Sequence, residues 1–134
     1  MARLGFQMEL PLPKPRACVR PAWRSTQKQI REQARAWSSF GKMPKRPVEV
    51  PIDELVRIDW DRRSAAELDS KGGRQYVAKI AEALKTCTPM PPGVGYMNDD
   101  GTVTLHDGNH RAAAARRLGL RSIPVLIYTP RRRP

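Results

Sequence analysis

His110 and Arg111 are the side chains of this sequence best suited to binding an anion, because they follow a glycine turn at the predicted start of a helix. A helix N-terminus carries about half a positive charge and several N–H groups without intrahelical partners, and both attract phosphate. Arg111 can hold a phosphate through two donors, and His110 can be neutral or charged near physiological pH. Asp107 adds a carboxylate at the rim, where it could hold Mg²⁺. These residues predict a phosphate-binding strand–turn–helix.

The elements around them follow from local propensities. Residues 102–105 alternate in the manner of a strand. Gly108 allows the positive φ that a tight turn needs, and Asn109 is predicted to cap the helix through its side-chain oxygen. A run of alanines favours the helix, and Gly119 is predicted to end it. Helices that bind nothing also start this way, so a purely structural turn is the alternative.

The segment from Asp107 to Arg111, with the alanine-rich helix, Leu118-Gly119-Leu120 and the strand 123–127, resembles the ParB/sulfiredoxin superfamily, and ParB-like nuclease domains in particular. In that superfamily an aspartate-glycine-x-x-arginine turn opens a helix that ends at leucine-glycine and returns through a proline-valine strand. The resemblance extends over residues 47–129 and is specific over 103–127. It implies a small α+β domain with a mixed sheet.

The resemblance also implies roles within the turn. Gly108, Asn109, His110 and Arg111 would bind the phosphates of ATP or another nucleotide, and Asp107 matches the nuclease-like branch. Sulfiredoxins carry a cysteine where this chain has Asn109, so sulfinic acid reduction is not expected. Partition proteins usually carry an acidic residue and two arginines there, so the resemblance does not favour a CTP-dependent clamp.

In enzymatic relatives an acid from the region corresponding to residues 59–69 faces the turn, and here Glu67 is the preferred candidate. With Asp107 it would hold Mg²⁺, which activates water or bridges phosphates, while His110 donates to the phosphate or acts as an acid. This mechanism predicts a metal-dependent nuclease or NTPase, in which Arg111→Ala abolishes nucleotide binding and leaves the fold intact. The alternative is that all the acids of this stretch are surface charges: Asp59, Asp61, Glu67 and Asp69.

Positive charge is concentrated at the two ends of the chain. Residues 1–46 hold 11 Lys/Arg against two acids, residues 47–129 hold 11 of each, and residues 130–134 hold three arginines. Basic ends on a neutral body suggest DNA, or alternatively RNA, as a partner, because each cation near a phosphate releases counterions. The predicted nucleic-acid contacts are Lys28, Arg31, Arg35, Arg131, Arg132 and Arg133.

Three parts are predicted: a basic, proline-rich arm with an amphipathic helix over 1–46, the α+β domain over 47–129, and a basic tail over 130–134. The helix is expected over 26–40, with a capping box at Thr26 and Gln29 and an end at Gly41. Its apolar stripe is Ile30, Ala34 and Trp37. Its basic face either contacts nucleic acid or is the solvated side of a helix docked on the domain.

Within the domain, periodicity predicts a helix over 74–86 whose buried stripe is Val77, Ile80, Ala81 and Leu84. The other predicted elements are a strand over 48–52, a helical turn over 53–56, a polar irregular stretch over 57–75, and strands over 94–97, 102–105 and 123–128.

Composition narrows the class of protein. No apolar run approaches the roughly 18 residues that a membrane span needs, and no signal-peptide segment begins the chain. We therefore expect a cytoplasmic protein without a membrane partner. Cys18 and Cys87 have no metal or redox spacing and are expected to be plain thiols.

Two other function classes stay open. One is a non-catalytic nucleic-acid-binding regulator or inhibitor, for example of a plasmid or phage, that acts through its basic ends, including on an acidic protein partner. The other is a small-molecule phosphotransferase similar to the serine kinases of this fold, which would turn over ATP or ADP without DNA. The sequence predicts no oligomeric state.

Overall fold

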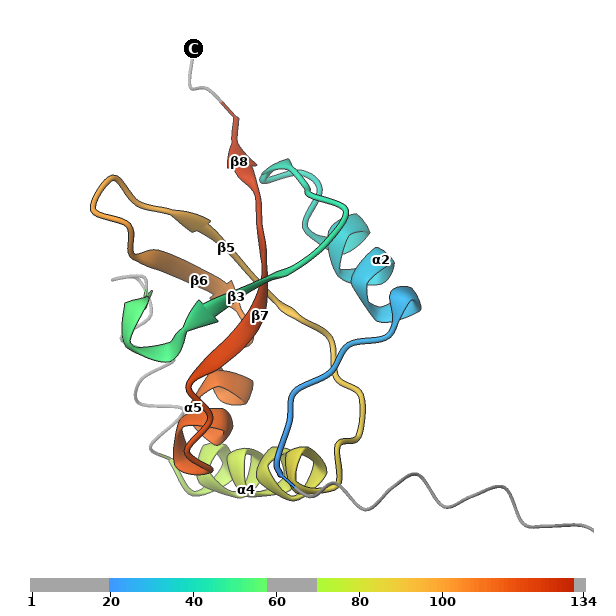
Figure 1. The fold of residues 1–134 in the computed structure, drawn as a ribbon, viewed down its shortest axis with the longest axis vertical. Coiled ribbons are helices and arrows are strands. Elements are labelled where there is room, and N and C mark those ends of the chain that lie inside the picture. Colours follow the sequence, from blue (N-terminus) through green and yellow to red (C-terminus); the bar gives the residue numbers. More distant parts are fainter. Residues whose placement is uncertain (1–19, 58–69, 132–134) are drawn as a thin grey trace, which may run out of the picture.

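The computed structural model describes residues 20–57 and 70–131, which are organised around a five-stranded mixed sheet (Figure 1). The strand order is β3-β7-β5-β6-β4. β7 runs antiparallel to β3 and parallel to β5, while β6 runs antiparallel to β5 and parallel to β4. The predicted α+β class with a mixed sheet is confirmed. The strands are β3 (Val48–Pro51), β4 (Leu55–Arg57), β5 (Gly93–Met97), β6 (Val103–Asp107) and β7 (Ser122–Ile127).

Helices α4 (Lys71–Lys85) and α5 (Asn109–Arg117) pack against each other on one side of the sheet (Figure 1). The predicted stripe of α4 is buried in the core between them and the sheet, so that prediction is confirmed. α4 begins at Lys71 rather than at 74, because Ser70 Oγ accepts a hydrogen bond from Gly73 N–H at 3.0 Å and caps the helix. No helix of the described ranges has the length and apolarity to cross a membrane.

Helix α2 (Gln27–Ala36) packs on the opposite face of the sheet. Successive residues of β7 point to opposite faces, and Val125 belongs to the core under α4 and α5, whereas Leu126 belongs to a second core with Ile30 of α2. The predicted capping box is confirmed, since Thr26 and Gln29 exchange side-chain to backbone hydrogen bonds. The helix is therefore docked on the domain by the apolar stripe that the sequence predicts.

The end of α2 differs from the prediction. The helix stops at Ala36, and Gly41 instead begins β2 (Gly41–Lys42), which pairs antiparallel with β8 (Thr129–Pro130). A Cβ on Gly41 would collide with the carbonyl oxygen of Thr129, so glycine serves a close approach between strands here rather than a helix end.

Residues 52–57 combine a short turn with a strand. The 3-10 turn η1 (Ile52–Glu54) begins one residue before the predicted helical turn and shares only Asp53 and Glu54 with it. Leu55 and Val56, however, belong to β4, because they pair in parallel with Val103 and Thr104 of β6. The described chain then resumes at Ser70, so Glu67 and the other acids of 59–69 lie outside the described residues.

Cys87 is disulfide-bonded, so the expectation of a plain thiol is wrong for this residue. It follows α4 with a φ of 56°, and its Sγ lies 3.5 Å from the carbonyl oxygen of Arg20. The chain before α2 runs beside the end of α4 here, because Ala22 N–H donates to Leu84 O at 3.1 Å. The other cysteine of the sequence, Cys18, lies outside the described residues.

Candidate functional site

Gly108 forms the turn between β6 and α5, with a φ of 100° and a ψ of 15°. This left-handed conformation favours glycine, as the sequence predicts. The predicted cap is wrong by one residue: Gly108 is the N-cap and Asn109 is the first residue of the helix. The first α5 hydrogen bond runs from Ala112 N–H to Gly108 O at 2.7 Å, which leaves the amides of His110 and Arg111 outside the helical ladder. The turn thus presents main-chain donors at a helix N-terminus.

The predicted end of α5 is confirmed. Gly119 has a φ of 77°, and its N–H donates to Arg116 O at 3.0 Å. Leu120 N–H donates to Ala115 O at 3.0 Å, which completes the pair of bonds that commonly closes a helix through a left-handed glycine. α5 is therefore held at both ends by glycines in the left-handed region.

Arg111 points back into the molecule rather than out from the turn. Its side chain is only 15% exposed, and its Nη2 lies 3.4 Å from Asp107 Oδ2 and 3.4 Å from Pro92 O. Its guanidinium carbon lies 5.6 Å from the ring centre of Trp23, within cation–π range. Among the described residues, no atom accepts a hydrogen bond from the buried Nε of Arg111. The cation that the sequence assigns to a phosphate is thus held beneath the turn.

Gln33 of α2 completes this buried network. Its Nε2 donates to Asp107 Oδ2 at 2.7 Å and to Pro92 O at 2.8 Å. Trp23, which covers Arg111, is itself fixed by a bond from its Nε1 to Pro91 O at 3.1 Å. Two side chains that precede the predicted domain therefore support the turn. Neither was among the predicted site residues. For Gln33, the available signal was that it shares the inner face of α2 with Ile30 and Trp37, at helical spacing.

His110 lies at the mouth of the turn, half-buried against α4. Its ring centre is 5.1 Å from that of Tyr76, whose side chain is half-exposed. Tyr76 was not among the predicted site residues, because an exposed tyrosine on a helix is unremarkable without its neighbours. The side chains at the mouth are thus an imidazole and a phenol, both able to donate to an anion.

The described residues give limited support for a metal at Asp107. Its Oδ2 already accepts hydrogen bonds from Gln33 and Arg111. Within the described ranges, no three His, Cys, Asp or Glu side chains gather in a way that could hold a metal ion. A lone carboxylate paired with a guanidinium is a poor ligand set for Mg²⁺, which is usually held through carboxylates together with substrate phosphates.

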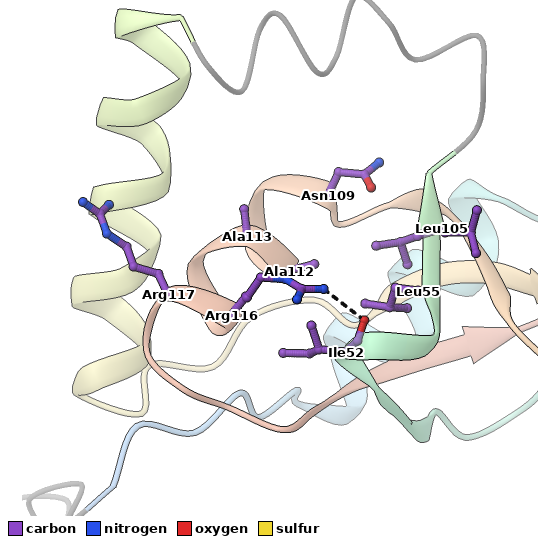
Figure 2. A pocket seen from close by; sticks show the side chains of 9 residues that line it. Ile52, Leu55, Leu105, Asn109, Ala112, Ala113, Arg116 and Arg117 are labelled. Atoms are coloured by element: carbon purple, nitrogen blue, oxygen red, sulfur yellow. Dashed lines mark hydrogen bonds between the residues drawn. The ribbon is translucent and has the colours of Figure 1, made fainter.

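A cavity of about 340 Å³ lies between α5 and the η1–β4 segment (Figure 2). Asn109 lies near the end where α5 begins, and Arg116 lies about two turns further along the helix, where its Nη2 donates to Ile52 O at 3.2 Å. Most of the wall is apolar. The lining residues are Ile52, Leu55, Val56, Leu105, Asn109, Ala112, Ala113, Arg116 and Arg117.

The predicted nucleic-acid contacts are distributed over two places. Lys28, Arg31 and Arg35 are all exposed on α2, on the side away from its buried Ile30. Arg131 is exposed just after β8, and Arg132 and Arg133 lie outside the described residues.

The fold defined by this sheet and its helices is that of sulfiredoxin. A crystal structure of sulfiredoxin from Arabidopsis thaliana matches this chain with a TM-score of 0.50 and 23% sequence identity, over 62% of this chain and 84% of that one. No protein-family model matches the chain, and no curated protein matches it. The sulfiredoxin-like fold that the resemblance implies is thereby confirmed.

Proposed function

We propose that this protein binds the phosphates of a nucleotide at the N-terminus of α5. The observation that carries the proposal is the left-handed Gly108, which opens the helix so that the amides of His110 and Arg111 stand outside its ladder. Such an end attracts phosphate through both its donors and its dipole. The resemblance to the ParB/sulfiredoxin superfamily, in which this turn binds nucleotide phosphates, supports the same assignment.

Each residue then has a distinct role. The amides of the first turn and the His110 imidazole would donate to phosphate oxygens, with Tyr76 beside them. Arg111 would act from beneath the turn, through its charge and as a support for Gly108, because its side chain is largely buried. Asp107 would hold Arg111 in place.

The described residues support nucleotide binding, whereas hydrolysis or transfer of a phosphate is a separate activity that needs its own assay. A nuclease, NTPase or phosphotransferase would need a group that activates water or an acceptor hydroxyl. Asp107 is engaged by Gln33 and Arg111, and Glu67 lies outside the described residues. Binding assays should therefore be run with and without Mg²⁺ and followed by assays for nucleotide and DNA hydrolysis.

The decisive variant is Asn109→Asp, tested by calorimetric titration with ATP, CTP and inorganic tripolyphosphate. A carboxylate at the first helical position stabilises the α5 dipole but repels a phosphate at the same place. The matched control is Gln27→Glu, which puts a carboxylate at the first residue of α2. We expect wild type and the control to bind alike and Asn109→Asp to bind more weakly by about tenfold or more. Unchanged affinity in Asn109→Asp, or no binding to wild type, would refute the proposal.

A second candidate function is polyanion binding through α2, where DNA is the preferred partner and RNA the alternative. The described residues 20–46 carry eight Lys/Arg against the single acid Glu32. Because Trp23 and Gln33 of the same segment support the turn, deleting residues 1–46 would not test this cleanly. Replacing Lys28, Arg31 and Arg35 together by alanine removes only exposed charge.

For this second candidate, the salt dependence of DNA binding is the measurement. Each lost phosphate contact should lower the slope of log affinity against log salt by about 0.9. The control replaces Arg74, Lys79 and Lys85, which are exposed on α4. If both triple variants keep the wild-type slope, neither helix is the contact surface. An acidic protein partner would instead be indicated by α2-dependent binding to acidic polypeptides without binding to DNA.

A further inference from the structure

The two-stranded ribbon of β2 and β8 extends past the end of the main sheet, beside the last turn of α2 (Figure 1). Side chains alternate between the two faces of such a pair. Gly41 faces inward, because a Cβ there would meet the ring of Tyr128. The same alternation gives the ribbon an outer face made of four exposed side chains: Phe40, Lys42, Thr129 and Arg131.

Phe40 is an aromatic side chain that is held in place and yet remains 44% exposed. Its ring centre lies 5.0 Å from that of Trp37, 5.2 Å from that of His106 and 6.2 Å from that of Tyr128. The angles between these rings and Phe40 are 56°, 60° and 70°, so none of the three is stacked flat on it. A ring fixed in this way loses little side-chain entropy when a planar partner stacks on its exposed part.

The charge around Phe40 is positive. The ribbon joins two stretches of the sequence, 33–48 and 123–134, that contain Lys and Arg but no Asp or Glu. Gly41 is paired with Pro130, so Arg131 lies level with Phe40 when the ladder is continued by one residue. Lys42 lies on the other side of Phe40 along the same face. The exposed cations of the two stretches that the structure describes are Arg35, Lys42, Lys45, Arg46 and Arg131.

An exposed aromatic ring between cations matches the chemistry of a single nucleic-acid strand. The phosphates of such a strand lie against the cations, and an unpaired base stacks on the ring. A duplex keeps its bases stacked on one another, so it would use the cations and gain nothing from the ring. Thr129 is the one uncharged polar side chain of the outer face, which thus offers no carboxylate or amide to select the 2′-hydroxyl of RNA.

We propose that the outer face of the β2–β8 ribbon binds single-stranded DNA, with a base stacked on Phe40 and the neighbouring phosphates on Lys42 and Arg131. Every base presents a flat face, so this contact tolerates any sequence. None of the three residues belongs to the Gly108 turn, and the inference therefore does not depend on the proposed phosphate site. It differs from polyanion binding through α2 because it requires unpaired bases.

The test compares the affinities of two labelled strands of about 20 nucleotides by fluorescence anisotropy: oligothymidylate, and an abasic strand with the same phosphates and no bases. We expect wild type to bind oligothymidylate about fivefold or more tightly, because stacking on Phe40 adds to the phosphate contacts. Phe40→Leu keeps an apolar side chain against Trp37, so it should fold, lose this preference and keep its affinity for the abasic strand. The matched control is Met97→Leu, at an exposed apolar position of β5.

Replacing Lys42 and Arg131 together by alanine supplies an independent measurement. This double variant should weaken the binding of both strands alike and lower the slope of log affinity against log salt by about 0.7 for each lost contact. The control replaces Lys79 and Lys85, which are exposed on α4.

Three results would overturn the inference. The first is equal affinity of wild type for oligothymidylate and the abasic strand, and the second is a retained preference in folded Phe40→Leu. The third is tighter binding to a duplex of the same length, or to oligouridylate, than to oligothymidylate. If the triple replacement on α2 abolishes binding while the ribbon variants bind as wild type does, the polyanion candidate stands and the ribbon is excluded.

Discussion

Gln33 Nε2 lies 2.7 Å from Asp107 Oδ2, so α2 is bonded directly to the strand end that precedes the Gly108 turn. The two residues are 74 positions apart in sequence. Asp107 in turn contacts Arg111, and Trp23 covers the guanidinium. The segment before the sheet is thus part of the scaffold of the candidate site, as well as the carrier of a basic surface.

Replacing Gln33 by leucine should destabilise the protein and weaken phosphate binding. The amide donates both to Asp107 and to Pro92 O, and leucine leaves these part-buried acceptors without it, which should cost roughly 1–3 kcal/mol of unfolding free energy. Chemical denaturation measures this loss. Glu32→Gln, at the exposed neighbouring position, is the control and should stay within about 0.5 kcal/mol of wild type. Equal stability of the two variants would show that the Gln33 bonds contribute nothing.

Arg111→Ala should lower stability as well as ligand affinity. From the sequence alone this variant was expected to leave the fold intact. The structure changes that expectation, because the 15% exposed side chain pairs with Asp107 and lies over Trp23. Losing the charge-assisted bond and the cation–π contact should cost about 1–3 kcal/mol. Arg111→Lys keeps the charge but not the planar group, so its loss should be smaller. A melting temperature of Arg111→Ala equal to that of wild type would contradict the buried arrangement.

Gly108→Ala should be more harmful than the same change at Gly101. Both glycines have positive φ, 100° and 88°, so both variants incur backbone strain. Only at Gly108 would the new Cβ lie 3.2 Å from Gly93 Cα and 3.3 Å from Arg111 Nη2; near Gly101 no atom of the described residues lies within 4 Å. Strain alone should cost about 1 kcal/mol, and the crowding should add to it. Thermal denaturation measures the stability of both variants, and the difference between them gives the cost of crowding around the Cβ at position 108. Equal losses of stability would show that the Gly108 turn relaxes to accommodate the Cβ.

The sequence predicted the parts of the fold whose signals are local. The stripe of α4 repeats at helical spacing, and a left-handed glycine was correctly assigned to Gly108 and to Gly119 because turns and helix ends require that conformation. Gly41 was misassigned for the same reason: local rules suggested a helix end, whereas the glycine is needed by a strand almost 90 positions away.

Of the candidate site, the sequence indicated only the residues of the turn between β6 and α5. The turn residues could be found from their spacing, but the direction of the Arg111 side chain is decided by Gln33, Pro92 and Trp23, which lie far from it in sequence. The cavity likewise depends on packing η1 and β4 beside α5, and no sequence window contains both walls. Side-chain partners and cavities are tertiary features, so periodicity and motif spacing do not reveal them.

Stability at high pH should depend on Tyr128. Its side chain lies among Phe40, Tyr96 and His106. Burial raises the pKa of the Tyr128 phenol above its ordinary value of 10.0, and Tyr96 raises that pKa further. A raised folded-state pKa means that the unfolded chain loses this proton first as the pH rises. The stability from keeping the phenol neutral is therefore complete below the unfolded pKa and is lost as the pH rises through the folded pKa.

Tyr128→Phe removes the titrating group and keeps the ring, so the unfolding free energy of the variant should fall less steeply than that of wild type between about pH 9 and 11. Denaturant titrations across this range measure the difference in slope. Tyr76→Phe, which removes a phenol from a 51% exposed position of α4, is the control for the substitution itself. Parallel curves for wild type and Tyr128→Phe would contradict the raised pKa, because the slope difference arises only if the folded and unfolded phenols titrate at different pH.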